Sequence, residues 1–210
     1  MRVPAILLTV LLGVTTSVFG ISQAEVTKAF TSPYQLEYNG YYLDAIKALE
    51  PALKNDPKGY VVNLRKGYLH YLSQQFNESI DYYNKAIAAS PMAVDAKLGK
   101  IMVLLAQGNY KGVESEGSLL VKMDNFNYLG NLRLAFALRM QKKFDFAEKV
   151  VAKMLKYYPV DLSYLAEFGI LKYANGDYAA SKKVFNEILT LDPSNALAYE
   201  YIALIEKQKK

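Results

Sequence analysis

Apolar residues recur every three or four positions along most of this chain, and the stretches with this spacing come in pairs. The clearest stretch covers residues 60–73, where Tyr68 and Tyr71 fall on one face of a helix. The next covers residues 76–89, and Ser90-Pro91 ends it because proline cannot continue a helix. The pattern therefore predicts a pair of antiparallel amphipathic helices.

This pair repeats with a period of 34 residues. One series of residues marks the end of each second helix and consists of Pro57, Pro91, Asn125, Pro159 and Pro193. A second series is aromatic in every unit and consists of Tyr42, Phe76, Tyr110, Phe144 and Tyr178. A fixed period of this length is typical of helical-pair repeats, in which each unit buries its apolar face only against its neighbours. The sequence thus predicts an all-α protein, a superhelical α-solenoid of antiparallel helix pairs.

Small residues fall where the two helices of a unit are expected to cross. These pairs are Gly67 with Ser79, Ala135 with Ala147, and Gly169 with Ser181. Side chains this small let two helix backbones approach closely. The aromatic series is expected to wedge between one unit and the next.

The repeated residues resemble those of a tetratricopeptide repeat array. The matching strings are Gly40-Tyr41-Tyr42 with Ala45, Ala52 and Asp56-Pro57; Gly108-Asn109-Tyr110; Lys143-Phe144 with Ala147 and Pro159; and Gly169 with Gly176-Asp177-Tyr178, Phe185 and Asp192-Pro193. They cover about residues 33–203. The resemblance implies a right-handed superhelix whose concave face holds a peptide or another protein.

The period also divides the chain into expected units. Residues 33–59 form a degenerate first repeat, since Pro33 interrupts its first helix and Pro51 is expected to kink its second. The other expected segments are a tail at 25–32, repeats at 60–93, 94–127, 128–161 and 162–195, and a C-terminal capping helix within 196–210.

The repeat at 94–127 is expected to be the weakest. Gly112 and Gly117 lie in its second helix, and Asn125 stands where the other units have proline. A glycine inside a helix costs about 1 kcal/mol relative to alanine. Two interpretations stay open at this point: a soft region that lets the superhelix flex, or glycines that only permit close packing.

The first residues have the layout of a secretory signal peptide. Met1-Arg2 is followed by an apolar run from Pro4 to about Phe19, and cleavage after Ala24 or Gly20 would fit the small residues there. We expect residues 1–24 to be removed and the protein to be exported, to a bacterial periplasm or outside the cell. An uncleaved leader that anchors the array to a membrane is the alternative.

Composition excludes several chemistries. The chain has no Cys and a single His, so disulfides, thiolate sites and paired-His metal sites are not expected. Its net charge of +5 is spread along the chain without a basic stripe, which argues against nucleic-acid binding. No catalytic motif or glycine-rich phosphate loop of standard spacing occurs. We therefore expect no enzyme activity, no cofactor and no metal.

In the resembled fold, the first helix of each pair lines the concave groove. The expected groove residues are mostly apolar or aromatic, and they are Leu64, Arg65, Tyr68, Tyr71, Leu98, Met102, Leu132, Arg133, Phe136, Met140, Ile170 and Tyr173. Tyr, Met and Arg are enriched in protein interfaces. A protein or peptide partner of unknown identity is the leading expectation.

The carboxylate-binding Lys and Asn of the family's best-known peptide pocket have no counterparts here. Leu64 with Tyr68, Leu98 with Met102, and Leu132 with Phe136 occupy those places. Two further uses of the groove stay open, namely cover by the chain's own residues 25–34 and contact between copies in a homo-oligomer.

Overall fold

The computed structural model describes residues 23–208, and every regular element in this range is a helix. In chain order the helices are α1 (Gln23–Tyr38), α2 (Tyr42–Ala48), α3 (Glu50–Asn55), α4 (Tyr60–Leu72), α5 (Phe76–Ala89), α6 (Val94–Ala106), α7 (Tyr110–Met123), α8 (Tyr128–Met140), α9 (Phe144–Leu155), α10 (Leu162–Ala174), α11 (Tyr178–Leu191) and α12 (Ala196–Lys207). The prediction of an all-α solenoid of helix pairs is confirmed.

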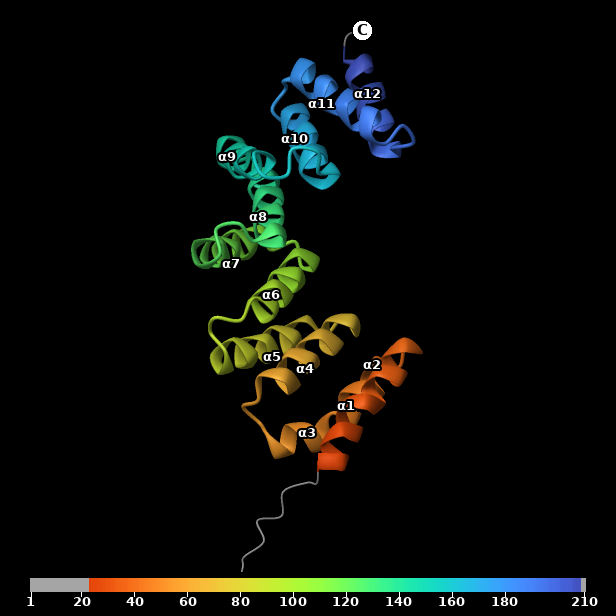
Figure 1. Ribbon diagram of the computed structural model, residues 1–210, viewed down its shortest axis with the longest axis vertical. Helices are drawn as coiled ribbons and strands as arrows, with labels where there is room; N and C mark the ends of the chain where they lie inside the picture. The colour runs from red at the N-terminus through yellow and green to blue at the C-terminus, as the bar shows by residue number, and fades with distance from the viewer. Residues whose placement is uncertain (1–22, 209–210) are drawn as a thin grey trace, which may run out of the picture.

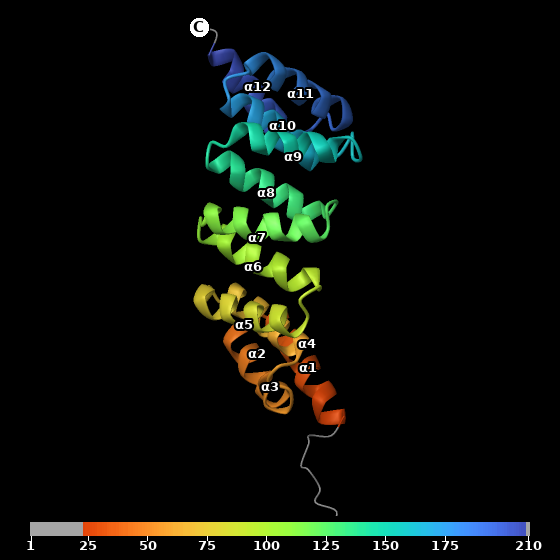
Figure 2. The ribbon, with the colours of Figure 1, turned by 90° about the vertical axis from the view of Figure 1, so that its left-hand side faces the viewer.

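The helix pairs stack one on another along the length of the molecule (Figure 1). Helices α7 and α9 lie on the left in Figure 1 and face the viewer in Figure 2, with α6, α8 and α10 behind them. Each helix packs against its partner and against the next unit, as α8 does on α7, α9 and α10. The apolar core is therefore a series of linked clusters that follows the stack.

The aromatic series marks the first residue of the second helix in every unit. Tyr42, Phe76, Tyr110, Phe144 and Tyr178 begin α2, α5, α7, α9 and α11. Their rings are half-buried. The Tyr110 ring meets Phe136 of the next unit at 5.9 Å between centroids, whereas the Phe76 ring meets Tyr71 of its own unit at 6.2 Å. The expected wedge between units thus describes Tyr110 better than Phe76.

Small residues mark the helix crossings, as the sequence predicts. The Ser79 hydroxyl donates to the Gly67 carbonyl at 2.6 Å, and the Ser181 hydroxyl donates to the Gly169 carbonyl at 2.9 Å. All four residues are buried. A serine at this position therefore joins the two helices of a unit directly.

The first unit differs from the expected one in two places. Residues 25–32, expected as a tail, lie inside α1, and Pro33 also lies inside that helix. The second helix is divided at Leu49 into α2 and α3, with Pro51 in the first turn of α3. Proline is tolerated there because backbone amides in the first turn of a helix have no hydrogen-bond acceptor within the helix. A new helix thus begins one residue before Pro51, where a kink was expected.

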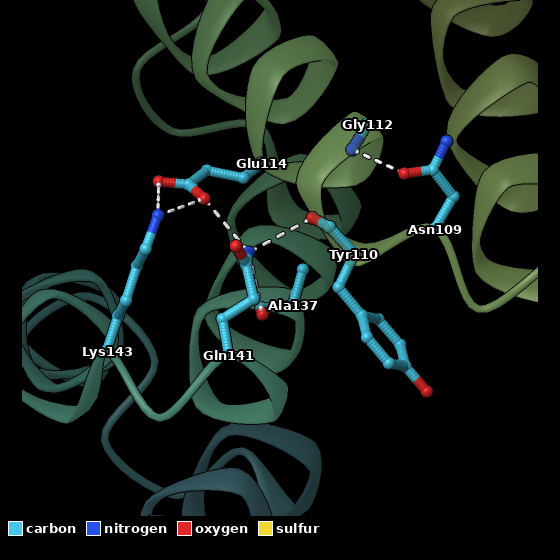
Figure 3. Close-up of polar contacts among 7 residues, drawn as sticks. All are labelled: Asn109, Tyr110, Gly112, Glu114, Ala137, Gln141 and Lys143. Carbon is cyan, nitrogen blue, oxygen red and sulfur yellow. Dashed lines mark hydrogen bonds and ion pairs between the residues drawn. The ribbon is translucent and has the colours of Figure 1, made fainter.

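Helix α7 is continuous through both glycines, and its N-terminal end is tied to the next unit (Figure 3). Asn109 caps the helix by accepting from the Gly112 amide at 3.0 Å. The Gln141 side-chain amide donates to the Tyr110 carbonyl at 3.1 Å and to Glu114 at 2.9 Å, and Lys143 also pairs with Glu114 (Figure 3).

The expected signal peptide lies outside the described residues, apart from its last two positions in α1. Between residues 23 and 208, no helix combines the length and the apolar character needed to cross a bilayer.

Candidate functional site

Two neighbouring cavities lie along the first helices of the repeats. The first has a volume of about 390 Å³ and is bounded by α1, α4, α5, α6 and α8. Its lining residues are Tyr34, Val61, Leu64, Arg65, Tyr68, Tyr83, Asp95, Leu98, Gly99, Met102 and Arg133. Apolar and aromatic side chains dominate, so this cavity suits an apolar side chain of a ligand.

The second cavity has a volume of about 440 Å³ and lies next to the first, toward the C-terminus. It is lined by Leu105, Tyr110, Leu132, Arg133, Phe136, Ser163, Ala166, Glu167 and Ile170. Arg133 lines both cavities. We call the two cavities together with Arg133 the groove.

Arg133 is a half-buried cation with no ion pair among residues 23–208. Its Nη1 donates to the Leu98 carbonyl at 2.9 Å, and burial lowers the pKa of its guanidinium from the ordinary value. Arginine nevertheless keeps its charge at neutral pH. Most of its five hydrogen-bond donors remain unused, so an anionic group could approach it from the groove.

Arg65 occupies the same register two units earlier but is already paired. It donates to Glu37 of α1, and its guanidinium carbon lies 3.9 Å from the centre of the Tyr34 ring. Both members of the pair are largely buried. Helix α1 therefore closes the N-terminal end of the groove and uses up the charge of Arg65.

Glu167 stands at this register in the repeat at residues 162–195, where it pairs with Arg139. Arg139 Nε donates to Glu167 Oε1 at 2.6 Å and Nη2 donates to Oε2 at 3.1 Å, a two-pronged pair. Burial raises the pKa of the Glu167 carboxyl, although Arg139 opposes this shift. The negative charge of Glu167 is thus neutralised by Arg139 inside the protein.

Gly99 stands at the same register between Arg65 and Arg133, and it forms the floor of the first cavity. A Cβ atom at this position would lie 2.3 Å from the ring of Tyr83. The absence of a side chain here lets the Tyr83 ring reach the cavity from α5. Burial raises the pKa of the Tyr83 hydroxyl well above the ordinary value.

The structure brings most of the predicted groove residues together. Leu64, Arg65, Tyr68, Leu98, Met102 and Arg133 line the first cavity, and Leu132, Arg133, Phe136 and Ile170 line the second. Tyr71, Met140 and Tyr173 line neither. The ring of Tyr71 packs on Phe76, and that of Tyr173 packs between Tyr178 and Tyr201.

Tyr83, Gly99 and Tyr110 also line the cavities and were not expected from the sequence. One signal was available: Gly99 replaces the arginine found one period before and one period after it. Tyr34 belongs to residues 25–34, for which cover of the groove was left open, and it lines the first cavity.

Stacked helix pairs with a continuous groove on one side define this molecule as a helical repeat protein. Models of the tetratricopeptide repeat match residues 36–91 and 64–112, and a second such model matches residues 162–195. Together these matches span more than half of the sequence, and the chain belongs to the tetratricopeptide repeat family. A search of curated protein sequences finds no match.

Several solved structures share this fold. A tetratricopeptide repeat protein from Parabacteroides merdae superposes with a TM-score of 0.80 at 15% identity, over 87% of this chain and 72% of that one. PilF of Pseudomonas aeruginosa superposes with a TM-score of 0.71 at 15% identity, over 88% of this chain and 84% of that one. YrrB, described as a repeat protein with an unusual peptide-binding site, superposes with a TM-score of 0.67 at 14% identity, over 82% of this chain and 89% of that one. At these identities the likeness concerns the fold alone.

Among residues 23–208, no three His, Cys, Asp or Glu side chains gather in a way that could hold a metal ion. The one histidine, His70, stacks on Tyr82 away from both cavities.

Proposed function

We propose that this protein is a non-enzymatic interaction scaffold whose groove binds a peptide segment of a partner protein. The segment places an apolar side chain in each of the two cavities and an acidic residue between them, against Arg133. Membership of the tetratricopeptide repeat family supports this function, since stacked repeats create extended concave binding surfaces.

One observation carries the proposal: Arg133 is a half-buried cation between two apolar cavities and has no carboxylate partner among the described residues. The other two charges of this register, Arg65 and Glu167, are each neutralised inside the protein. A buried charge is costly unless it is paired. A carboxylate of the bound segment would supply the missing partner.

We place this scaffold in the bacterial envelope or the secreted fraction. The apolar run that follows Arg2 supports export, and the absence of cysteine fits a compartment where disulfides are not required. Intact mass of the protein recovered from cells tests the location, because a start near Ile21 or Glu25 indicates that the leader has been removed.

Photo-crosslinking in the native envelope tests the groove. A photoreactive side chain at Met102, in the first cavity, is expected to trap a partner, whereas one at exposed Lys111 of α7 is not. Arg133→Met keeps the bulk of the side chain and removes its charge, so it should abolish the Met102 crosslink.

The control is Tyr199→Ala, which removes an exposed ring from α12 at a distance from the groove. Crosslinking that is equally strong from Lys111, or that is unchanged by Arg133→Met, would remove the proposed binding mode. Each variant must keep the helical circular-dichroism spectrum of the original protein.

A further inference from the structure

Three of the five loops that connect one unit to the next carry an exposed apolar residue at a fixed register, where the other two have Lys58 and Ser194. Met92, Phe126 and Val160 stand 34 residues apart, and their side chains are 73%, 43% and 62% exposed. They belong to the loops that follow α5, α7 and α9, which lie along the right-hand edge in Figure 2. We call this surface the apolar edge.

Direct contacts join two of these loops into one surface. The ring of Phe126 meets the ring of Tyr157 at 4.5 Å between centroids, although Tyr157 belongs to the next unit. Lys153 of α9 donates to the Asn125 carbonyl at 2.7 Å, and its ammonium lies 5.8 Å from the centre of the Phe126 ring. Tyr157 is itself 61% exposed. The apolar edge is therefore continuous across two repeats.

The opposite edge of the same repeats has a different chemistry. In the four full repeats, the turns between the two helices contain Gln74-Gln75, Gly108-Asn109, Lys142-Lys143 and Gly176-Asp177. No exposed large apolar side chain occurs in these four turns. Among the loops and turns of the four full repeats, the exposed large apolar residues therefore occur at one edge, whereas the turn of the first unit carries exposed Tyr41 at the opposite edge.

Positive charge flanks the apolar edge. Lys122 and Lys156 are exposed, stand at the same register at the ends of α7 and α9, and form no ion pair among the described residues. Two carboxylates lie nearby and keep their charge while they accept hydrogen bonds from neutral groups: Asp124 accepts from Asn127 at 3.0 Å, and Asp161 accepts from the Tyr128 hydroxyl at 3.0 Å and caps α10. The edge thus presents the ammonium groups of Lys122 and Lys156 beside exposed rings, with these two carboxylates among them.

We infer that the apolar edge docks on an anionic lipid surface. Aromatic rings favour the interfacial layer of a bilayer, and lysines next to them reach the anionic headgroups. A polar peptide would leave the exposed side chains of Met92, Phe126 and Val160 without apolar cover. The docking uses none of the residues that line the groove, so it does not depend on the proposed function.

The absence of tryptophan from this chain allows a direct test. Phe126→Trp introduces a single indole at the apolar edge. Lys111→Trp is the matched control, since it places an indole on the exposed N-terminal end of the same helix, α7, at the opposite edge. Both full-length variants are mixed with vesicles of phosphatidylcholine alone or with one third phosphatidylglycerol, including brominated lipid as a quencher.

With the anionic vesicles, the indole at position 126 is expected to shift to shorter wavelength and to be quenched, whereas the indole at position 111 is not. Replacing both Lys122 and Lys156 by Gln should weaken this binding about 10- to 30-fold, since each lysine near an anionic surface contributes roughly fivefold. Higher salt should weaken it as well.

Three outcomes would overturn the inference: no quenching at position 126, equal quenching at position 111, or equal binding to vesicles without anionic lipid. A wavelength shift that appears without vesicles and grows with protein concentration would assign the edge to contact between two copies and equally reject lipid docking. Because each indole reports only its own surroundings, a leader that remains attached does not change this comparison.

Discussion

Gly169 of α10 provides the space that the ring of Phe185 of α11 occupies. A Cβ atom on Gly169 would lie 2.8 Å from Cζ of that ring, a distance that requires the ring to move. Phe185 is fully buried and stacks on Tyr201 of the next helix at 4.8 Å, so it has no room to do so. Gly67 and Tyr83 show the same relationship three units earlier, at 2.9 Å.

The same two positions combine a smaller with a larger residue in each of the four full repeats. Where the first helix has glycine, the second has a ring; the four pairs are Gly67 with Tyr83, Ile101 with Gly117, Ala135 with Val151, and Gly169 with Phe185. All eight residues are buried. A Cβ atom on Gly117 would lie 3.4 Å from Cβ of Leu134 in α8, so this glycine in the middle of α7 lets the next unit pack closely against it.

This complementarity predicts the outcome of a swap. Gly117→Val alone should destabilise the protein by about 1–3 kcal/mol through overpacking, and Ile101→Ala alone by about 2–4 kcal/mol through a cavity. The double variant copies the combination found at Ala135 and Val151. We expect it to recover at least 1 kcal/mol relative to the sum of the single changes, as measured by urea unfolding of all four proteins.

The matched control combines Gly117→Val with Ala198→Gly, a buried change in α12 outside this unit. Those two effects should simply add, because distant sites are independent. Additive energies for Gly117→Val and Ile101→Ala as well would show that the two positions do not share space.

Helix order and boundaries could be predicted from the sequence because the period repeats the same local signals. The aromatic series gives the first residue of α5, α7, α9 and α11, and Ser79 and Ser181 lie at the crossings where the spacing puts them. These features depend on residues close in sequence, which a 34-residue pattern records directly.

Features that depend on contacts between units could not be predicted this way. The sequence left open whether Gly117 weakens its own helix or permits close packing. The choice depends on Leu134 of the next unit, whose Cβ would lie 3.4 Å from a Cβ atom at Gly117. The pairing of Arg65 with Glu37 depends on how α1 packs, and α1 departs from the period. From the sequence, Arg133 was only one of two arginines expected in the groove, and its lack of an ion pair could not be predicted.

Hydrogen exchange of α7 tests whether the third unit is a soft point. We expect the amides of residues 110–122 to be about as protected as those of 178–190, because Asn109 caps the helix and Gln141 and Lys143 hold its N-terminal end. Gln141→Ala should remove part of this protection from the first turns of α7 and leave α11 unchanged. Much faster exchange in the unmodified α7 would support the alternative of a flexible point.

The Arg139–Glu167 pair is expected to contribute more than any exposed pair of this chain. Both side chains are mostly buried, at 13% and 8% exposure, so Glu167→Gln leaves a buried guanidinium without its counter-charge. Breaking such a pair costs about 3–5 kcal/mol; retention of a neutral hydrogen bond should place this variant near the lower end. Thermal or urea unfolding measures the loss.

Lys47 and Asp44 provide the comparison, since this pair is 78% and 58% exposed. Lys47→Gln should change stability little, because exposed ion pairs contribute little. Equal losses for the two variants would mean that burial does not set the strength of the Arg139 pair.

His70 should make the stability of this protein decrease between pH 7 and pH 5. Its ring is 8% exposed, stacks on Tyr82 at 5.0 Å between centroids, and has Nδ1 at 2.7 Å from the Gln75 side-chain oxygen. Burial lowers the pKa of the ring below its ordinary value of about 6.5, and the charge of nearby Lys66 acts in the same direction; Gln75, Glu78 and Glu50 oppose the shift. The unfolded chain therefore binds a proton that the folded one does not, so stability falls as the pH drops below about 6.5.

Since the chain contains a single histidine, His70→Gln should remove most of this slope while keeping a group that can bond to Gln75. Urea midpoints of both proteins at pH 7, 6 and 5 measure the effect, and parallel slopes would show that the pKa of His70 is not depressed by folding.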